Sequence, residues 1–398
     1  MALSNHAPYV KRITIENFRP LRNVVWELPA GTEPAGWHVV IGDNGSGKTS
    51  LLKAVSLALL AHDATKSLRI EPGSFVGGAG AKTSCQLTMA DGPGRRWDAT
   101  RPFGPTGRPA ASGYHASFGA NRRFGGAWSA KQLEGSDPVA ARHASLFDPT
   151  WALGDLVGWL KDLRLDEDPS VSGKTALSWV KTFVNQPGLL PDAQLIDVRS
   201  SGPVFRDGGG QELGIEALSD GYQSAVGLTL EVLRQLFAAY PPADVLQRDE
   251  HGRIVVGIPG LVLIDEVDAH LHPTWQQRIG VFFQRHFPRV QFLVTTHSPL
   301  VCRAAEVGTI YRLPRPGTDE TGAMIVGQDR ERLLFGDVLD AYGTEVFGAD
   351  VTRGSRGQAM FDRLAELNTK ARFAGPLSAD ETTEQSDLQG LLINGSGQ

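Results

Sequence analysis

The sequence predicts an α/β protein built around a mostly parallel sheet, and three observations lead to this fold class. Short apolar strands alternate along the chain with helical patterns, which is typical of parallel strands joined by helical crossovers. One strand–helix junction carries a glycine-rich loop. The 398 residues are 41% hydrophobic and 21% charged, so a sizeable core can form, and the length suits roughly two to three domains.

Charge and cysteine content exclude several classes of protein. A net charge of −5 excludes a uniformly basic nucleic-acid-binding protein but is compatible with a local basic groove. Cys85 and Cys302 are too few for a disulfide framework or a four-thiolate zinc site. Residues 1–15 have no signal-peptide pattern, and no apolar run reaches the ~20 residues that span a membrane. We therefore expect a cytoplasmic protein and no membrane partner.

The N-terminal region is expected to contain three strands and a helix. Residues 12–16 and 23–28 are short β-branched runs, and residues 37–41 form an apolar run of the buried-strand type. After the glycine loop, apolar residues spaced three and four apart at positions 52, 55 and 59 predict a helix.

From about residue 66 the pattern loosens, and we interpret this region as a lobe inserted into the core. Glycine-rich stretches surround a predicted strand at 84–89. Apolar periodicity predicts helices at 153–165 and 175–185. A strand pair at 194–198 and 203–206 is expected to return the chain to the core.

A long helix and a second set of strands are predicted in the C-terminal half. Apolar spacing predicts a helix from Ser219, which is a suitable N-cap, to Tyr240, where Pro241 ends it. Polar residues from Gly375 predict a loose tail. The remaining expected elements are strands at 261–264 and 291–295, a helix near 273–286, and a hairpin of 309–313 with 323–326.

The first motif is a phosphate-binding loop. Residues 42–49, GDNGSGKT, match G-x-x-x-x-G-K-[ST] between a predicted strand and a predicted helix. Glycines let backbone N–H groups point at phosphate oxygens, and the helix N-terminus favours negative charge. Lys48 is expected to reach the β- and γ-phosphates, and Thr49 to hold Mg²⁺. The predicted ATP-binding residues are Gly42, Asn44, Gly45, Ser46, Gly47, Lys48, Thr49 and Ser50.

The second motif is a pair of carboxylates after a buried strand. Residues 261–264 are apolar, and Asp265 and Glu266 follow them directly. Parallel strands deliver such residues to the edge of the sheet where the phosphate loop also lies. We predict that Asp265 binds Mg²⁺, directly or through water, and that Glu266 is the general base for the attacking water.

Two further motifs accompany these. Residues 218–224, LSDGYQS, have the form L-S-x-G-x-x-S at a helix start, which on its own would also suit a plain helix cap. His297 follows the strand at 291–295 within the sequence TTHSP. A lone histidine in such a place would also suit a structural hydrogen bond.

The series of motifs resembles the ABC-type ATPase superfamily, and in particular the bacterial AAA-family ATPases of the SMC/RecF/OLD-like kind. The residues that carry this resemblance are 265–273 (DEVDAHLHP), 295–299 (TTHSP) and the opening 15–18 (IENF). The resemblance covers roughly residues 10–65 and 190–330. It implies a P-loop NTPase of ABC-ATPase type, with a mostly parallel core sheet, an antiparallel β subdomain and an inserted helical lobe.

The resemblance also implies an assembly and a division of the chain. Two protomers would sandwich ATP, with Lys48, Glu266 and His297 acting from one chain and Ser219 and Gly221 binding ATP in trans. The expected segments are 1–65 (N-terminal half of the ATPase core), 66–193 (inserted arm or lobe), 194–330 (C-terminal half of the core) and 331–398 (helical extension and polar tail).

The chain departs from this family in three places. No heptads occupy the region between Thr49 and Leu218, so a long coiled coil is excluded. Too little sequence follows His297, without a clear carboxylate constellation, for a TOPRIM nuclease domain. The glutamine switch loop is not placed: Gln86 is a weak candidate, and residues 118–123 (FGANRR) either approach the nucleotide or the dimer face, or form a basic surface turn.

Two side-chain groups stay open between interpretations. His270 and His272 are two residues apart, but no third metal ligand is evident, and the resemblance places His272 in a loop that crosses to the partner subunit. Arg95, Arg96, Arg101 and Arg108 either form a phosphate-contacting patch or belong to a solvated loop.

The biological role follows only from the resemblance. It implies a DNA-linked or anti-phage defence ATPase that acts as a homodimer or higher oligomer with a separate effector protein. One alternative is a DNA-repair ATPase of the RecF kind that binds DNA directly. Another is the nucleotide-binding subunit of a transporter. A GTPase is disfavoured because no Asn-Lys-x-Asp motif is present.

Overall fold

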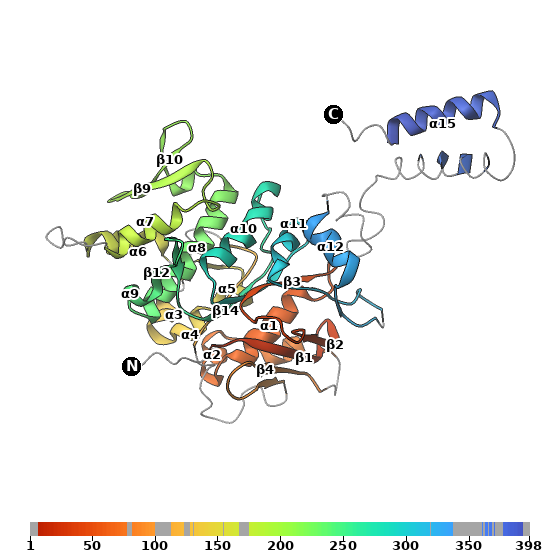
Figure 1. Ribbon diagram of the computed structural model, residues 1–398. Helices are drawn as coiled ribbons and strands as arrows, with labels where there is room; N and C mark the ends of the chain where they lie inside the picture. The colour runs from red at the N-terminus through yellow and green to blue at the C-terminus, as the bar shows by residue number, and fades with distance from the viewer. Residues whose placement is uncertain are drawn as a thin grey trace. The chain divides into compact units, whose positions relative to one another are not determined.

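The computed structural model describes most of the chain. Its described residues are 7–77, 82–99, 113–122, 128–129, 131–153, 155–166, 175–318, 320–336 and 377–392, with 360, 363, 364, 366, 367 and 370. The chain divides into two compact units, Met1–Gly336 and Asp337–Gln398. The first unit has a layered α/β structure and carries the four motifs (Figure 1).

A six-stranded sheet forms the centre of the first unit and confirms the predicted fold class. The strand order is β17-β16-β3-β15-β14-β6, and every neighbouring pair is parallel except β16 and β17. The sequence predicts all of these strands except β6. Their bounds are β3 (Gly36–Ile41), β6 (Tyr114–Phe118), β14 (Gly260–Ile264), β15 (Val290–Thr295), β16 (Gly308–Arg312) and β17 (Ala323–Met324).

A four-stranded antiparallel sheet lies on one side of helix α1 (Lys48–Leu59), in the order β2-β1-β4-β5. Helix α1 contacts β1, β4 and β5 of this sheet and also β6, β14 and β15 of the parallel sheet. The helix therefore lies between the two sheets, which explains why most of its residues are buried. The antiparallel strands are β1 (Val10–Phe18), β2 (Leu21–Glu27), β4 (Ser84–Met89) and β5 (Arg95–Asp98).

Helix α10 (Pro273–His286) covers the other face of the parallel sheet. Side chains alternate between the two faces of a strand, and Val40 and Leu293 pack in the cluster that contains α1. Their neighbours Trp37 and Phe292 instead pack against Phe283 of α10, with ring centroids 6.1 and 5.1 Å from that of Phe283. The parallel sheet is thus covered on both faces, as its near-continuous apolar strands require.

Most of the remaining helices and strands belong to the segment between β6 and β14. The predicted helices at 153–165 and 175–185 are α6 (Leu156–Leu165) and α7 (Ala176–Val184), and the helix predicted from Ser219 is α8 (Asp220–Ala239).

None of the described helices is long and apolar enough to cross a membrane. The other elements of this unit are α2 (His62–Ser67), η1 (Pro72–Phe75), β7 (Trp128–Ser129), α3 (Lys131–Ser136), α4 (Pro138–Ala141), α5 (Ala144–Phe147), β8 (Trp151–Ala152), β9 (Ala193–Arg199), β10 (Gly202–Asp207), β11 (Glu212–Gly214), η2 (Ile215–Ala217), α9 (Pro242–Val245), β12 (Leu246–Arg248), β13 (Ile254–Val256), α11 (Pro299–Cys302), η3 (Arg303–Glu306) and α12 (Gly327–Phe335).

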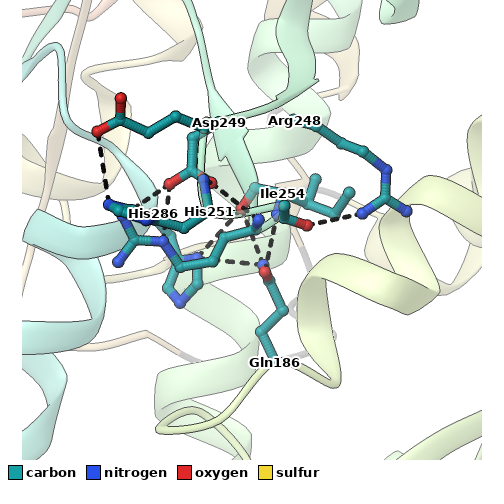
Figure 2. A network of polar contacts seen from close by, with 9 residues as sticks. Gln186, Arg248, Asp249, His251, Ile254 and His286 are labelled. Carbon is teal, nitrogen blue, oxygen red and sulfur yellow. Dashed lines mark hydrogen bonds and ion pairs between the residues drawn. The ribbon is translucent and has the colours of Figure 1, made fainter.

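A polar network joins Gln186, which follows α7, to the β12–β13 hairpin and α10 (Figure 2). The Gln186 side chain donates to the Ile254 carbonyl at 2.9 Å and accepts from the Ile254 N–H at 2.8 Å, so it pairs with β13 as a neighbouring strand would. His286 Nδ1 lies 3.1 Å from Gln186 Nε2. Asp249 accepts from the backbone N–H groups of His251 and Arg253, which closes the hairpin turn. These bonds fix the lobe to the end of α10.

The second unit contains helix α15 (Ala379–Leu392), so the prediction of a loose chain from Gly375 is wrong for this stretch. Two exposed ion pairs join α15 to the residues before it. Arg363 contacts Glu384 at 3.0 Å, and Lys370 contacts Glu381 at 2.5 Å. The polar composition that predicted a loose tail instead supplies charge partners for a surface helix.

Replacement of Gly280 by alanine should lower the free energy of unfolding by ~1–3 kcal/mol through overpacking. A Cβ at this position of α10 would lie 2.4 Å from the Cβ of Ala304 and 2.8 Å from a ring carbon of Trp37. Chemical denaturation measures the change. The matched control is Gly135→Ala in α3, where a Cβ meets nothing within 4 Å and helix propensity should make the change neutral or stabilising. Equal effects of the two substitutions would contradict the packing argument.

Candidate functional site

The phosphate-binding loop joins β3 to α1, as the motif predicts. Gly45 and Gly47 have φ angles of 79° and 96°, which glycine adopts without strain. A Cβ at Gly42 would lie 2.5 Å from the Ser46 hydroxyl. Among the described residues, that buried hydroxyl has no hydrogen-bond partner, so it is available to a phosphate oxygen. The loop therefore suits a phosphate-bearing ligand at the N-terminus of α1.

Lys48 lies at the centre of the site. Its ammonium group donates to the carbonyl oxygens of Gly42 and Asp43 at 2.7 and 3.2 Å. Burial lowers the pKa of Lys48. The negative charge of Glu266 opposes this shift most strongly among the carboxylates, followed by that of Asp265. The structure therefore brings the loop lysine and the two predicted carboxylates into one electrostatic environment.

Asp265 joins the phosphate loop to the strand that precedes His297. Thr49 Oγ1 donates to Asp265 Oδ2 at 2.7 Å, and Thr295 Oγ1 donates to Asp265 Oδ1 at 2.6 Å. A hydroxyl and a carboxylate side by side are the hard oxygen ligands that Mg²⁺ prefers next to a substrate phosphate. Thr49 and Asp265 thus fit the predicted magnesium site.

Glu266 has an unusual backbone. Its φ is 44°, in the left-handed region that a non-glycine residue occupies at a cost of ~1–2 kcal/mol. The Glu266 N–H donates to Thr295 Oγ1 at 2.8 Å. Thr295 therefore fixes both carboxylate residues at once: it donates its proton to Asp265 and accepts from the backbone of Glu266. Thr295 stands within the TTHSP motif, but the motif alone predicts no role for this residue.

His297 lies in the same electrostatic environment. Burial lowers its pKa, the Lys48 charge lowers it further, and Asp268, Glu266 and Asp265 oppose the shift. The neighbouring Thr296 hydroxyl donates to Asp268 at 2.5 Å, which ties the loop of His297 to the loop after Glu266. The predicted cis residues Lys48, Thr49, Asp265, Glu266 and His297 therefore converge at one edge of the sheet.

Ser219 and Gly221 lie at the N-terminus of α8. Ser219 is the N-cap residue of α8, as predicted, but it is exposed and its side chain makes no capping hydrogen bond in the described part of the chain. The Gln223 side chain instead donates to the Leu218 carbonyl at 2.8 Å. A Cβ at Gly221 would lie 3.4 Å from the carbonyl oxygen of His270.

Arg122 contradicts one of the alternatives left open for residues 118–123, the basic surface turn, at its own position. Only 6% of this residue is exposed, so it is buried. Its guanidinium donates to the carbonyls of Asp265 and Glu266 at 2.8 and 2.9 Å. Arg123 lies outside the described residues. Gln86, the weak candidate for the glutamine loop, lies in β4 opposite Thr14 of β1.

The other candidate groups are accounted for in part. Within the described residues, no group of three or more His, Cys, Asp or Glu side chains is arranged to hold a metal ion, and this includes His270 and His272. Arg96 pairs with Asp98 at 3.2 Å in strand β5. Arg101 and Arg108 lie outside the described residues. Cys85 and Cys302 are both buried and unpaired with each other.

The fold and the site together define a P-loop nucleotide-binding site in which Asp265 and Glu266 follow the strand next to that of His297. Comparison with protein families agrees with this class. Residues 160–303 match the family described as "AAA domain, putative AbiEii toxin, Type IV TA system", and residues 12–87 match a family described as "AAA domain". Two separate parts of the chain therefore match AAA domains, and these parts contain the phosphate loop and the two carboxylates.

Several curated proteins are similar to parts of this chain. The Septu protein PtuA of Bacillus mycoides (strain KBAB4) is 25% identical over 90% of this chain and 46% of its own length. The retron Vc95 probable ATPase of Vibrio cholerae serotype O1 biovar El Tor is 40% identical over 23% of this chain and 16% of its own length. The chain thus spans less than half the length of either relative.

The chain is also similar to solved SMC head structures. The SmcHead bound to the C-winged helix domain of ScpA has a TM-score of 0.42 and 17% identity, covering 82% of this chain and 100% of that chain. The SMC head domain from Thermotoga maritima has a TM-score of 0.39 and 14% identity, covering 80% of this chain and 99% of that chain.

Replacement of Thr295 by valine should lower the ATPase kcat by ~10- to 100-fold. The change removes the hydroxyl that donates to Asp265 and accepts from the Glu266 N–H, which leaves both groups without this partner. We expect this to cost ~1–3 kcal/mol of stabilisation in the site. About 1.4 kcal/mol in the activation free energy corresponds to a tenfold change in rate. Steady-state phosphate release measures it. Thr295→Ser keeps the hydroxyl and should stay within a few-fold of the parent. A valine variant as fast as the serine variant would contradict this role of Thr295.

Proposed function

We propose that the chain hydrolyses ATP within a nucleotide-gated dimer whose two sites are each completed by the partner protomer. The observation that carries this proposal is the division of the predicted site. The residues Lys48, Thr49, Asp265, Glu266 and His297 converge in one protomer. The exposed Ser219 hydroxyl at the start of α8, by contrast, makes no capping hydrogen bond within the described residues. A hydroxyl, a glycine N–H and a helix N-terminus form an anion site for a nucleotide held elsewhere.

Each cis residue has a chemical task in this proposal. Lys48 and the N–H groups of the loop hold the β- and γ-phosphates, and Thr49 with Asp265 would hold Mg²⁺, which neutralises phosphate charge. Glu266 orients the attacking water and accepts its proton. His297 is kept largely neutral at pH 7 by its lowered pKa, so one ring nitrogen can donate to a γ-phosphate oxygen.

The proposed biological role is anti-phage defence together with a separate effector protein. Support comes from the two kinds of relative, the Septu protein PtuA and the retron ATPase, and from the resemblance to SMC/RecF/OLD-like ATPases. In this role ATP binding closes the dimer and hydrolysis reopens it, so the nucleotide state controls the effector. The same proposal includes DNA as a further partner, which the chain would bind directly.

Replacement of Glu266 by glutamine should allow ATP binding but slow hydrolysis by ~10²-fold or more, because the general base is lost. The closed dimer should then accumulate. Light scattering in the presence and absence of Mg-ATP measures the solution mass, and single-turnover hydrolysis measures the rate. A shift from monomer to dimer mass on addition of Mg-ATP is expected. Hydrolysis at the parental rate would refute the assignment of Glu266.

Replacement of Ser219 by arginine tests the trans role. The bulky cation should block approach of the partner's nucleotide, so turnover should fall to the level of an isolated protomer while the protomer's own affinity for ATP changes little. Equilibrium binding of a fluorescent ATP analogue, compared with steady-state turnover, separates the two effects. Loss of nucleotide binding itself would mean that Ser219 acts in cis, against the proposal.

A further inference from the structure

Arg122 is a buried arginine that contacts the backbone of the loop that carries the proposed catalytic carboxylates. It lies four residues after the end of strand β6, which pairs in parallel with β14, so it emerges at the same sheet edge as Asp265. Its Nη1 donates to the carbonyl of Asp265 at 2.8 Å and its Nη2 to that of Glu266 at 2.9 Å. A longer contact of 3.5 Å reaches the carbonyl of Val267.

The acceptors of this guanidinium are unusual for a buried cation. In the described part of the chain they are carbonyl and hydroxyl oxygens, and no carboxylate side chain bonds to it directly. Burial lowers the pKa of Arg122 to about 10, and Asp265, Asp268 and Glu266 oppose the shift. The side chain is therefore charged at neutral pH. A buried charge is retained only where its hydrogen bonds are nearly all satisfied.

The left-handed backbone of Glu266 explains what these hydrogen bonds accomplish. A non-glycine residue at a φ of 44° persists only if its surroundings hold it from more than one side. Thr295 holds the N–H of Glu266 at 2.8 Å, and Arg122 holds its carbonyl at 2.9 Å. Together they fix both peptide groups that flank the Glu266 Cα and hence the direction of its side chain.

Arg122 also connects this loop to two other elements. Its Nη1 donates to the carbonyl of Gly119 at 3.1 Å, which closes the turn after β6. Its Nε lies 3.5 Å from the hydroxyl of Ser224, a buried residue in the second turn of α8. Helix α8 begins next to Ser219, so one side chain links the start of this helix to Glu266.

We propose that Arg122 is a positioning residue for ATP hydrolysis: it holds Glu266 in its left-handed conformation and couples that conformation to helix α8. The inference rests on the proposed role of Glu266 as the general base. Arg122 itself touches neither the nucleotide nor the water in this proposal. Its effect should therefore appear in kcat and be small in nucleotide affinity.

The test compares Arg122→Ala and Arg122→Lys with the parent in steady-state hydrolysis and in equilibrium binding of ATP. Displacement of a catalytic group by ~1 Å costs about 10²-fold, so the alanine variant should lose ~10²-fold in kcat and change the Kd for ATP by less than about threefold. Lysine keeps the charge but cannot reach several carbonyls at once, so its kcat should be intermediate. Guanidinium ion at millimolar concentration should restore part of the hydrolysis rate of the alanine variant. The same addition should leave the parent's rate unchanged.

A matched control separates positioning from a general loss of an arginine. Arg248 also donates to a backbone carbonyl, that of Gly252 at 2.7 Å, but lies in the β12–β13 hairpin. Arg248→Ala should keep the parental kcat. If Arg122→Ala does not fold, the lysine variant carries the test, and a parental kcat in a folded Arg122→Lys would overturn the proposal. A loss of ATP affinity matching the loss of kcat would overturn it as well.

A double variant distinguishes this inference from the proposed function. If Arg122 acts through Glu266, its replacement should not slow single-turnover hydrolysis further in the Glu266→Gln background, because effects that share one group are not additive. A full additional ~10²-fold loss there would overturn the positioning role of Arg122. Parental hydrolysis by Glu266→Gln alone would instead refute the general-base assignment, whatever the Arg122 variants do.

Discussion

The hydrogen bonds that Asp265 accepts from Thr49 and Thr295 are the interaction on which the site depends. They join the helix after the phosphate loop to the ends of β14 and β15, which only a parallel sheet brings to one edge. The order of the neighbouring strands β3, β15 and β14 fixes how far the phosphate loop lies from the carboxylates. The other elements of the first unit fix the position of this edge. Helix α1, for example, is held in place because it packs between the two sheets.

The fold could be predicted where the signal is local. Strands β3, β14 and β15 are apolar runs, and α8 and α10 have regular apolar spacing. Strand β6 could not be predicted, because His115 and Ser117 interrupt its apolar pattern although both are buried. Their partner is His143, whose Nε2 lies 2.8 Å from His115 Nδ1 and whose Nδ1 lies 2.9 Å from Ser117 Oγ. A buried polar strand is stable only with such a distant partner, and the sequence does not reveal which residue that is.

The same difference applies to the site. Short motifs contain the five residues Lys48, Thr49, Asp265, Glu266 and His297, so their convergence could be predicted from the sequence. Thr295 and Arg122 act through contacts across the chain: Arg122 precedes Asp265 by 143 residues. The sequence contains two signals for them, a threonine pair at the end of a strand and an arginine shortly after a glycine. Neither signal states what the side chain reaches, because the strand order decides that.

Helix α8 reaches the loop after β14, residues 265–272, in two ways: through Arg122 and directly at His270. The Ser224 hydroxyl lies 3.5 Å from Arg122 Nε, and a Cβ at Gly221 would be in van der Waals contact with the His270 carbonyl oxygen at 3.4 Å. His270 itself has a φ of 66°, the second left-handed non-glycine residue of this short loop. A loop with two strained residues has few alternative conformations. A displacement of α8 should therefore move Glu266 as well, since the loop cannot adjust its own conformation to compensate. In the proposed dimer the exposed end of α8 contacts the partner's nucleotide, and a helix that also supports Glu266 through Arg122 makes each site sensitive to the nucleotide in the other.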